Sequence, residues 1–157
     1  MVEIRAIKAK DLDKIAFFEK DFFHEDAFSI DSLEKMIEDK YFIGLIAEND
    51  SEVIGYLFVS YFGDEANILK VAVEKFYRKQ GVAKSLLAKM LTELQEICVE
   101  KLFLEVDENN EPALKLYNAL GFEKTRIRYS YYKNGANAVE MVKTLKVWLI
   151  VTLFYFQ

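Results

Sequence analysis

The strands of this chain are marked by alternating and continuous hydrophobic runs. Glu3 to Ile7 alternates polar and apolar residues, which predicts a half-buried strand. Phe42 to Glu48 and Val53 to Tyr61 are apolar runs on either side of the polar turn Asn49-Asp50-Ser51, and together they predict a hairpin. Further strands are predicted at Ala66 to Val73, Leu102 to Val106, Phe122 to Tyr132 and Val139 to Leu145, with a turn at Asn134-Gly135.

Four other segments have the spacing of amphipathic helices. The strongest follows Gly81, with one apolar stripe made of Ala83, Leu86, Leu87, Met90, Leu94 and Ile97. Helices are also predicted after Asp11, which is a candidate cap, and near Asp31. Pro112 suits the first turn of a fourth helix, and Gly121 ends it. The order β-α-α-β-β-β-α-β-α-β-β predicts one α/β sandwich.

Composition supports a single folded domain. The chain has 157 residues, of which 52% are hydrophobic and 30% are charged, a mixture typical of globular proteins. At this length, folding buries about 70% of the surface of the unfolded chain, enough for a core without disulfides or metal.

Charge and side-chain chemistry exclude several classes of function. The net charge of −5 argues against binding to nucleic acid or to an anionic membrane, since both need a basic surface. Cys98 and His24 are the only residues of their types, so a disulfide framework and a metal site built from several Cys or His are excluded. We therefore expect no metal.

The two ends of the chain differ in character. The N-terminus has no apolar signal core, which favours a cytoplasmic location. Aromatic residues gather at Phe17 to Phe28 and at Trp148 to Phe156. The uncharged run Val147 to Phe156 is too short to span a bilayer, which takes about 20 residues. Its role is open: it could extend the last strand, cover a groove, join a dimer, or be the remnant of a protease-cleaved tag.

A strand-to-helix turn at Val73 to Ala83 is a candidate phosphate site. Its basic residues and Gly81 precede the strongest helix, whose N-terminus presents free N–H groups and the positive end of the helix dipole. Taken alone, the segment is better interpreted as an ordinary turn with solvated cations.

Two side chains are candidates for proton transfer. Glu105 interrupts the apolar strand around Leu104, and burial would raise the pKa of its carboxyl, as suits a general base. Tyr117 lies on the apolar face of the helix after Pro112 and could donate a proton. The alternatives are a solvated glutamate and a core tyrosine, and each is more common for such a residue taken alone.

In combination these segments form an ordered set of motifs. They run as Arg-x-x-Gly-x-Ala from Arg78, Leu104-Glu105-Val106, Asn-x-x-Ala-x-x-Leu-Tyr from Asn110, Gly121-Phe122, Arg128-Tyr129-Ser130-Tyr131-Tyr132, and Ala-x-x-Met from Ala138. Over residues 3–146 the chain resembles the GCN5-related N-acetyltransferases, and within them the ribosomal-protein alanine N-acetyltransferases of the RimI type.

The resemblance implies a fold and a cosubstrate. The fold would be a mixed, mostly antiparallel sheet flanked by helices and splayed between its fourth and fifth strands, with residues 1–146 as one N-acetyltransferase domain and 147–157 as an apolar tail. Acetyl-CoA would bind to Val71, Ala72, Val73, Arg78, Lys79, Gln80, Gly81, Val82, Ala83, Lys84, Asn110 and Tyr117. Pantetheine would pair with the backbone of Val71 and Val73 like an added strand.

The resemblance also implies catalytic and acceptor residues. Glu105 would be the general base and Tyr117 the general acid, with an amide N–H, that of Val71, stabilising the oxyanion. The acceptor site would be formed by Phe28, Ser29, Arg128, Tyr131 and Tyr132. Acidic residues on the first helix and just after it, Glu19, Asp21, Glu25 and Asp26, could favour a basic peptide, or could be solvated charges.

Two segments depart from the RimI-type pattern. Ala27-Phe28-Ser29 stands where the family has Pro-Trp-Ser, and Ala136-Asn137 stands where it has Glu-Asp.

The expected acceptor is the N-terminal amine of a protein or peptide, including a ribosomal protein, and the enzyme is expected to be a monomer or a weak homodimer. The alternatives are a small amine such as a polyamine as acceptor, or a non-catalytic acetyl-CoA-binding module. A nucleotide-binding fold is disfavoured because Gly-x-x-x-x-Gly-Lys is missing.

Overall fold

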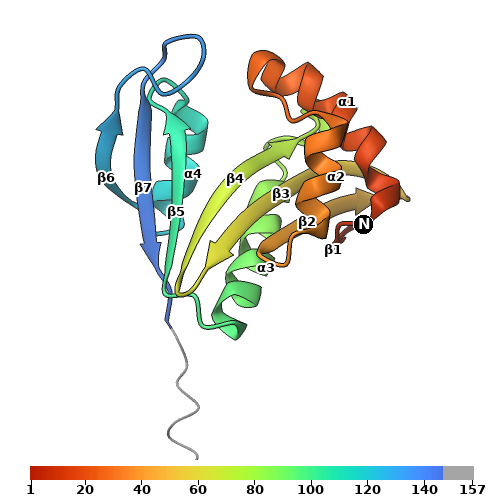
Figure 1. Ribbon diagram of the computed structural model, residues 1–157, viewed down its shortest axis with the longest axis horizontal. Coiled ribbons are helices and arrows are strands. Elements are labelled where there is room, and N and C mark those ends of the chain that lie inside the picture. Colours follow the sequence, from red (N-terminus) through yellow and green to blue (C-terminus); the bar gives the residue numbers. More distant parts are fainter. Residues whose placement is uncertain (147–157) are drawn as a thin grey trace, which may run out of the picture.

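Seven strands form one mixed sheet in the order β1-β2-β3-β4-β5-β7-β6 (Figure 1). The computed structural model describes residues 1–146, so the predicted tail at 147–157 lies outside the described residues. The strands are β1 (Val2–Ala6), β2 (Phe42–Asn49), β3 (Glu52–Phe62), β4 (Glu65–Val73), β5 (Lys101–Asp107), β6 (Glu123–Arg128) and β7 (Ala138–Thr144). Neighbouring strands are antiparallel except for β4 and β5, which are parallel.

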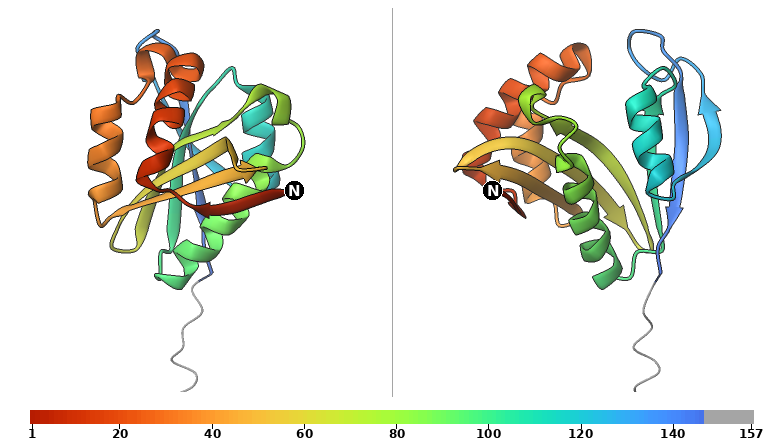
Figure 2. Two further views of the ribbon diagram at one scale, coloured as in Figure 1. Left: turned by 90° about the vertical axis from the view of Figure 1, so that its right-hand side faces the viewer. Right: turned by 180° about the vertical axis from the view of Figure 1, so that it is seen from behind.

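Helices cover both faces of the sheet. The α-helices within residues 1–146 are α1 (Leu12–Phe23), α2 (Ile30–Glu38), α3 (Val82–Glu96) and α4 (Glu111–Ala119), and their number and order are as predicted. Figure 2 shows α3 and α4 on the face opposite to α1 and α2. Successive residues of β3 therefore serve two cores: Tyr56 and Phe58 pack in the cluster with α1 and α2, while Leu57 and Val59 pack in the cluster with α3.

The sheet opens between β4 and β5, as the family resemblance implied. The two strands pair through three positions, from Glu65↔Lys101 to Asn67↔Phe103, although β4 continues to Val73 and β5 to Asp107. Beyond Asn67 the strands diverge, and this separation is visible in Figure 1. One edge of the second half of β4 is therefore left without a partner strand.

A bulge in β4 lies where this opening begins. Phe58 of β3 pairs with Lys70, but the next residue, Val59, pairs with Ile68, so Leu69 is an extra residue in β4. Such a bulge bends its strand and increases its twist. It thus helps to turn the end of β4 away from β5.

The last hairpin differs from the prediction. The strand expected to reach Tyr132 ends at Arg128, and Tyr131 and Tyr132 lie in the loop before β7. This loop has its own local structure, because Asn137 accepts a hydrogen bond from the amide of Ser130 at 2.9 Å, and Ser130 has a φ of 50°. Side-chain acceptors thus compete with strand pairing here.

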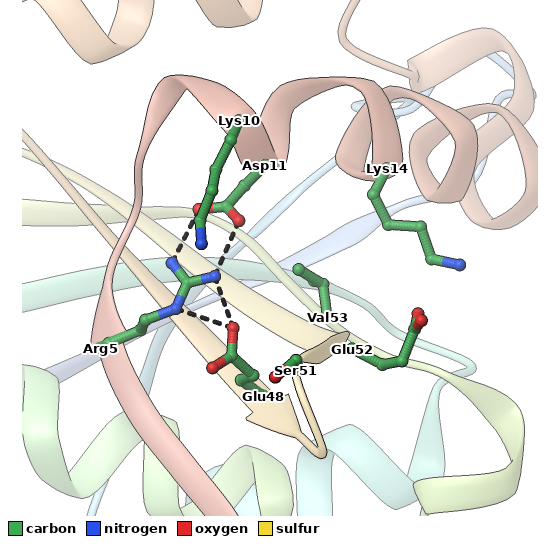
Figure 3. A pocket seen from close by; sticks show the side chains of 8 residues that line it. All are labelled: Arg5, Lys10, Asp11, Lys14, Glu48, Ser51, Glu52 and Val53. Carbon is green, nitrogen blue, oxygen red and sulfur yellow. Dashed lines mark hydrogen bonds and ion pairs between the residues drawn. The ribbon is translucent and has the colours of Figure 1, made fainter.

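The expected cap of the first helix is also different. Asp11 occupies the N-cap position of α1, but its side chain makes no capping hydrogen bond there. Its carboxylate instead accepts two 2.8 Å hydrogen bonds from Arg5, which also donates to Glu48 (Figure 3). This cluster connects β1, the start of α1 and β2. The pocket around Arg5 therefore has a structural role, because the Arg5 guanidinium is already paired with two carboxylates.

No helix within residues 1–146 has the length and apolar character needed to cross a membrane.

Candidate active site

The open edge of β4 presents main-chain groups at Val71 and Val73. Glu74 donates its amide to the carbonyl of Ile54 in β3 at 2.8 Å. Since backbone groups alternate in direction along a strand, those of Val73 and Val71 point away from β3, toward the opening. The Val73 carbonyl already accepts a 2.9 Å hydrogen bond from Nε of Arg78. Arg78 does not occupy the amide of Val73 or the amide and carbonyl of Val71, which could pair with a pantetheine chain.

The turn before α3 is shaped to admit an anion. Gly81 is the N-cap of α3 with a φ of 83°, and a Cβ placed on it would meet no atom within 4 Å. The first intrahelical bond is donated by Ser85 to the Gly81 carbonyl, so the amides of Val82, Ala83 and Lys84 precede the hydrogen-bonded ladder. Free amides, open space and the helix dipole fit a pyrophosphate.

The side chains of this turn are less available than its backbone. Gln80 donates to the carbonyl of Phe76 at 2.7 Å, and the guanidinium of Arg78 lies 5.3 Å from the ring of Phe22. Arg78 therefore packs toward α1. Lys79 and Lys84 are exposed at this end of α3.

Glu105 lies on the face of β5 that is directed away from α3 and α4. Its neighbours Leu104 and Val106 are buried in the core on that helical side, while the Glu105 side chain is 16% exposed. Burial raises the pKa of its carboxyl, Arg128 lowers it, and Glu140 raises it again. The pKa of Glu105 is raised on balance, which makes it a better proton acceptor than an ordinary glutamate.

Tyr117 approaches from the other face. It is 4% exposed on α4 and packs edge-on against Phe122 at 5.6 Å between ring centroids. Burial raises the pKa of its phenol to about 12, so the hydroxyl is protonated at neutral pH and can serve as a proton donor. Within the described part of the chain, no hydrogen bond joins Tyr117 to Glu105.

Tyr132 is the phenol whose surroundings include both candidates. Burial raises its pKa, and Tyr131, Asp107, Glu105 and Tyr117 each add to this effect. The rings of Tyr131 and Tyr132 meet edge-on at 5.0 Å. The loop before β7 thus brings Tyr132 near Glu105 and Tyr117, and both tyrosines lie on this loop instead of on the predicted strand.

The remaining predicted contact residues have local structural tasks. Ser29 caps α2, accepting from the amide of Ser32 at 3.2 Å, and Asn110 caps α4, accepting from the amide of Ala113 at 3.2 Å. Phe28 is half-buried, and its amide donates to Glu19 at 3.3 Å. The Asn110 side chain is exposed in spite of this bond, so it remains accessible to a cosubstrate.

A buried charge cluster between α1 and the strands β3 and β4 was not predicted. Glu19 is fully buried, so its interpretation as a surface acid for a basic peptide is wrong. Its carboxylate accepts from the Tyr56 hydroxyl at 3.1 Å and lies 3.8 Å from Nζ of Lys70. Burial raises the pKa of Glu19 and lowers that of Lys70. The sequence does indicate the burial of Glu19 by its position, because Glu19 follows Ile15 by four residues and so lies on the buried stripe of α1.

Two lysines hold the segment between α1 and α2. Lys70 of β4 donates to the carbonyl of Asp26 at 2.7 Å, and Lys133 of the loop before β7 donates to the carbonyl of Glu25 at 2.6 Å. The Lys70 ammonium also lies 3.6 Å from the centre of the Phe23 ring. Lys133 therefore links the α1–α2 segment to the far side of the sheet opening.

Residues 1–146 contain no group of three or more His, Cys, Asp or Glu placed to hold a metal ion. What the site offers is a free strand edge, an open helix N-terminus, a carboxylate of raised pKa and protonated phenols. Together they can bind a phosphate-bearing thioester, remove a proton from an amine and return one to a leaving group.

Comparison with known proteins places this geometry in a family. The model of the acetyltransferase (GNAT) family matches residues 9–122. Ribosomal protein bS18 alanine N-acetyltransferase of Haemophilus influenzae is 30% identical over 146 residues, covering 93% of this chain and 98% of that protein. The Escherichia coli enzyme of the same name is 41% identical over 69 residues, and this match covers 44% of the chain and about half (47%) of the enzyme.

A solved structure shows the same arrangement. The crystal structure of the ribosomal-protein-S18-alanine N-acetyltransferase from Escherichia coli superposes with a TM-score of 0.83 at 26% identity, covering 93% of this chain and 95% of that one. The similarity includes the strands on both sides of the opening, since it covers nearly the whole described chain.

Proposed function

Because this chain belongs to the acetyltransferase (GNAT) family, we propose that it transfers an acetyl group from acetyl-CoA to the N-terminal α-amine of a protein, of the ribosomal-protein-alanine type. The single observation that carries the proposal is the opening between β4 and β5, where Glu105 and Tyr117 come from opposite faces of β5. The near-full-length similarity to the Haemophilus influenzae enzyme, which acts on an alanine of bS18 by its name, supports the choice of acceptor.

Acetyl-CoA supplies a thioester carbonyl that an amine can attack. The amides at the start of α3, from Gly81 to Lys84, bind its pyrophosphate, and Val71 and Val73 pair with its pantetheine amides. Asn110 contacts the same cosubstrate from the start of α4. Ala72 separates the two pairing residues and turns its backbone toward β3.

Glu105 prepares the acceptor. An α-amine has a pKa of about 8 and is mostly protonated at neutral pH, so it must lose a proton before it attacks. Glu105 takes that proton, directly or through one water, and its raised pKa suits the task. The Val71 amide donates to the carbonyl oxygen as negative charge develops there. As the C–S bond breaks, Tyr117, with a pKa of about 12, donates its proton to the departing sulfur, and the nitrogen now bonded to the acetyl carbon releases its remaining excess proton to solvent.

The acceptor peptide lies on the side of Tyr131 and Tyr132. These phenols, with Phe28 and Ser29 from the α1–α2 segment and Arg128 from β6, form the walls of the acceptor site. The exposed acids Asp21 and Glu25 are left to attract a basic peptide, since Glu19 is buried. We place the activity in the cytoplasm, within residues 1–146 and without a metal, in a monomer or weak homodimer.

The test is mass spectrometry of a panel of N-terminal peptides incubated with the enzyme and acetyl-CoA. The panel includes an alanine-initiated ribosomal peptide, its N-terminally blocked form, and diamines. A gain of one acetyl group on the free α-amine alone supports the proposal. Acetylated diamines with unmodified peptides would point to a small-amine acetyltransferase, and acetyl-CoA binding without thiol release from any amine would point to a binding module.

A further inference from the structure

Two carboxylates lie side by side on the acceptor face. Glu105 of β5 and Glu140 of β7 are direct partners across the two strands, and their side chains are 16% and 13% exposed. Like charges placed opposite one another destabilise a sheet unless a cation lies between them. Arg128 of β6 supplies that cation, with its Nη1 at 3.5 Å from Glu105 and its Nε at 3.4 Å from Glu140.

The route of Arg128 across the sheet is set by small and aromatic neighbours. Arg128 is the register partner of Ala138 in β7, and Ala138 is also the partner of Asp107 in β5. A small residue at this position lets the guanidinium extend over β7 toward β5. The guanidinium carbon of Arg128 lies over the ring of Tyr131, 5.6 Å from its centroid, in a cation–π contact.

Glu140 is held far more firmly than Glu105. It accepts 2.7 Å and 3.2 Å hydrogen bonds, from the Thr125 hydroxyl and from Nη2 of Arg126, in addition to its contact with Arg128. Thr125 lowers the pKa of Glu140, so this carboxylate stays charged. Glu105 has one ion pair within residues 1–146, through Oε1, and its 3.5 Å separation exceeds that of a charge-assisted hydrogen bond.

We propose that Glu140 is a positioning residue, which draws the guanidinium of Arg128 sideways and thereby leaves an oxygen of Glu105 free to take the proton of the acceptor amine. Without Glu140, Arg128 would turn its two-nitrogen edge to Glu105 and form a bidentate pair. Such a pair would occupy both oxygens of the base and weaken it. The inference rests on the proposed role of Glu105.

The charged and titratable groups around Glu105 come from several elements. They are Glu140 of β7, Arg126 and Arg128 of β6, Tyr131 and Tyr132 of the loop before β7, and Asp107 of β5 itself. Replacing Glu140 removes one of these charges directly and releases two others, Arg126 and Arg128, which both contact it. The experiment must therefore separate the direct effect from the one that acts through Arg128.

The test is a titration of the Glu105 carboxyl by ¹³C NMR, with the signal assigned by its loss in Glu105→Gln. In Glu140→Gln the midpoint is expected to fall by about one pH unit. The matched control is Glu123→Gln, which removes an exposed charge from β6 at a distance from Arg128 and is expected to leave the midpoint in place. In an Arg128→Met background, the effect of Glu140→Gln is expected to shrink to less than half.

A kinetic measurement accompanies the titration. Glu140→Gln is expected to lower kcat about three- to tenfold at neutral pH, while the KM for acetyl-CoA stays unchanged. An unmoved Glu105 midpoint, or an effect of equal size with and without Arg128, would overturn the inference. If Glu140→Gln does not fold, Glu140→Asp, which keeps the charge but withdraws it from Arg128, is expected to shift the midpoint downward by less.

The titration does not depend on turnover. A shifted Glu105 midpoint in a protein that acetylates no peptide would support the inference about Arg128 and refute the proposed function. An unmoved midpoint in a protein that acetylates peptides would refute the inference and support the proposed function.

Discussion

The ammonium of Lys70 lies 3.8 Å from the carboxylate of Glu19, which has no exposed surface at all. The pair joins β4, at its bulge, to α1, and Lys70 also holds the carbonyl of Asp26. Breaking a buried ion pair costs more than a surface pair because one charge is left without a partner. This pair therefore secures the α1–α2 segment against the strand that borders the opening.

Lys70→Met is expected to lower the free energy of unfolding by about 3 kcal/mol, as measured by urea denaturation at neutral pH. Adding Glu19→Gln to this variant should recover part of the loss, because the amide carries no charge. The matched control is Lys89→Met, since Lys89 is half exposed and 3.9 Å from Glu93, and its loss should change stability by less than about 0.5 kcal/mol.

The loss in Lys70→Met is also expected to depend on pH. The folded-state pKa of Glu19 is raised, so its stabilising contribution is present below its ordinary value near 4.5 and disappears as pH rises through the raised folded value. Removing Lys70 raises that value further. The difference between wild type and variant should therefore narrow as pH falls from 7 toward 5, and a constant difference would contradict the role given to this pair.

Gly81→Val tests the proposed pyrophosphate site. Its side chain would project into open space at the start of α3, where the anion is proposed to lie. Gly63→Val is a matched control, because Gly63 also has a positive φ of 61° and nothing near its Cβ position, but lies in the β3–β4 turn. Both variants should lose about 1–2 kcal/mol of stability from backbone strain. By calorimetry, Gly81→Val alone should weaken acetyl-CoA binding, by tenfold or more.

Lys133→Met removes the link from the loop before β7 to the Glu25 carbonyl. We expect the KM for the acceptor peptide to rise roughly three- to tenfold, since a hydrogen bond from a charged group is worth about 1.5–3 kcal/mol and this one is partly solvated. Acetyl-CoA affinity should not change. Lys124→Met, which removes an exposed lysine of β6, is the control, and an equal rise in KM in both variants would refute the role of this link.

Tyr117 should leave the alkaline side of the pH profile flat. Its pKa is about 12, so the phenol keeps its proton well above the pKa of an α-amine near 8. The value of kcat/KM for the peptide should rise up to about pH 9 and then hold to about pH 10.5. A decline centred near pH 9 that is absent from Tyr117→Phe would show that this phenol titrates earlier than its burial implies.

The main elements of the fold could be predicted from local patterns. The start of α3 is marked by Gly81 and by the apolar stripe that follows it, and the start of α4 is marked by Pro112. The bounds of both helices depend on nearby residues. The motif order around Glu105 and Tyr117 indicated the splayed sheet through resemblance, because no local pattern encodes where two parallel strands part. The opening itself is a property of the β4 bulge and of the whole sheet.

The misses share a physical cause. Tyr131 and Tyr132 have strand-like residue types, but Asn134 and Asn137 give nearby amides acceptors outside any ladder. Glu19 and Lys70 are 51 positions apart by their numbers, and their pairing arises when α1 packs on β4. The contact of Arg128 and Glu140 with Glu105 could likewise not be predicted, because only the register of β5, β7 and β6 brings these residues together.

The most direct test of the account is the turnover of Glu105→Gln and Tyr117→Phe with a peptide that wild type acetylates. Both variants should bind acetyl-CoA with wild-type affinity by calorimetry. Turnover should fall by about 10²–10⁴-fold in Glu105→Gln, as expected for loss of a general base, and measurably in Tyr117→Phe. Wild-type turnover in both variants, with binding intact, would contradict proton transfer by this pair of residues.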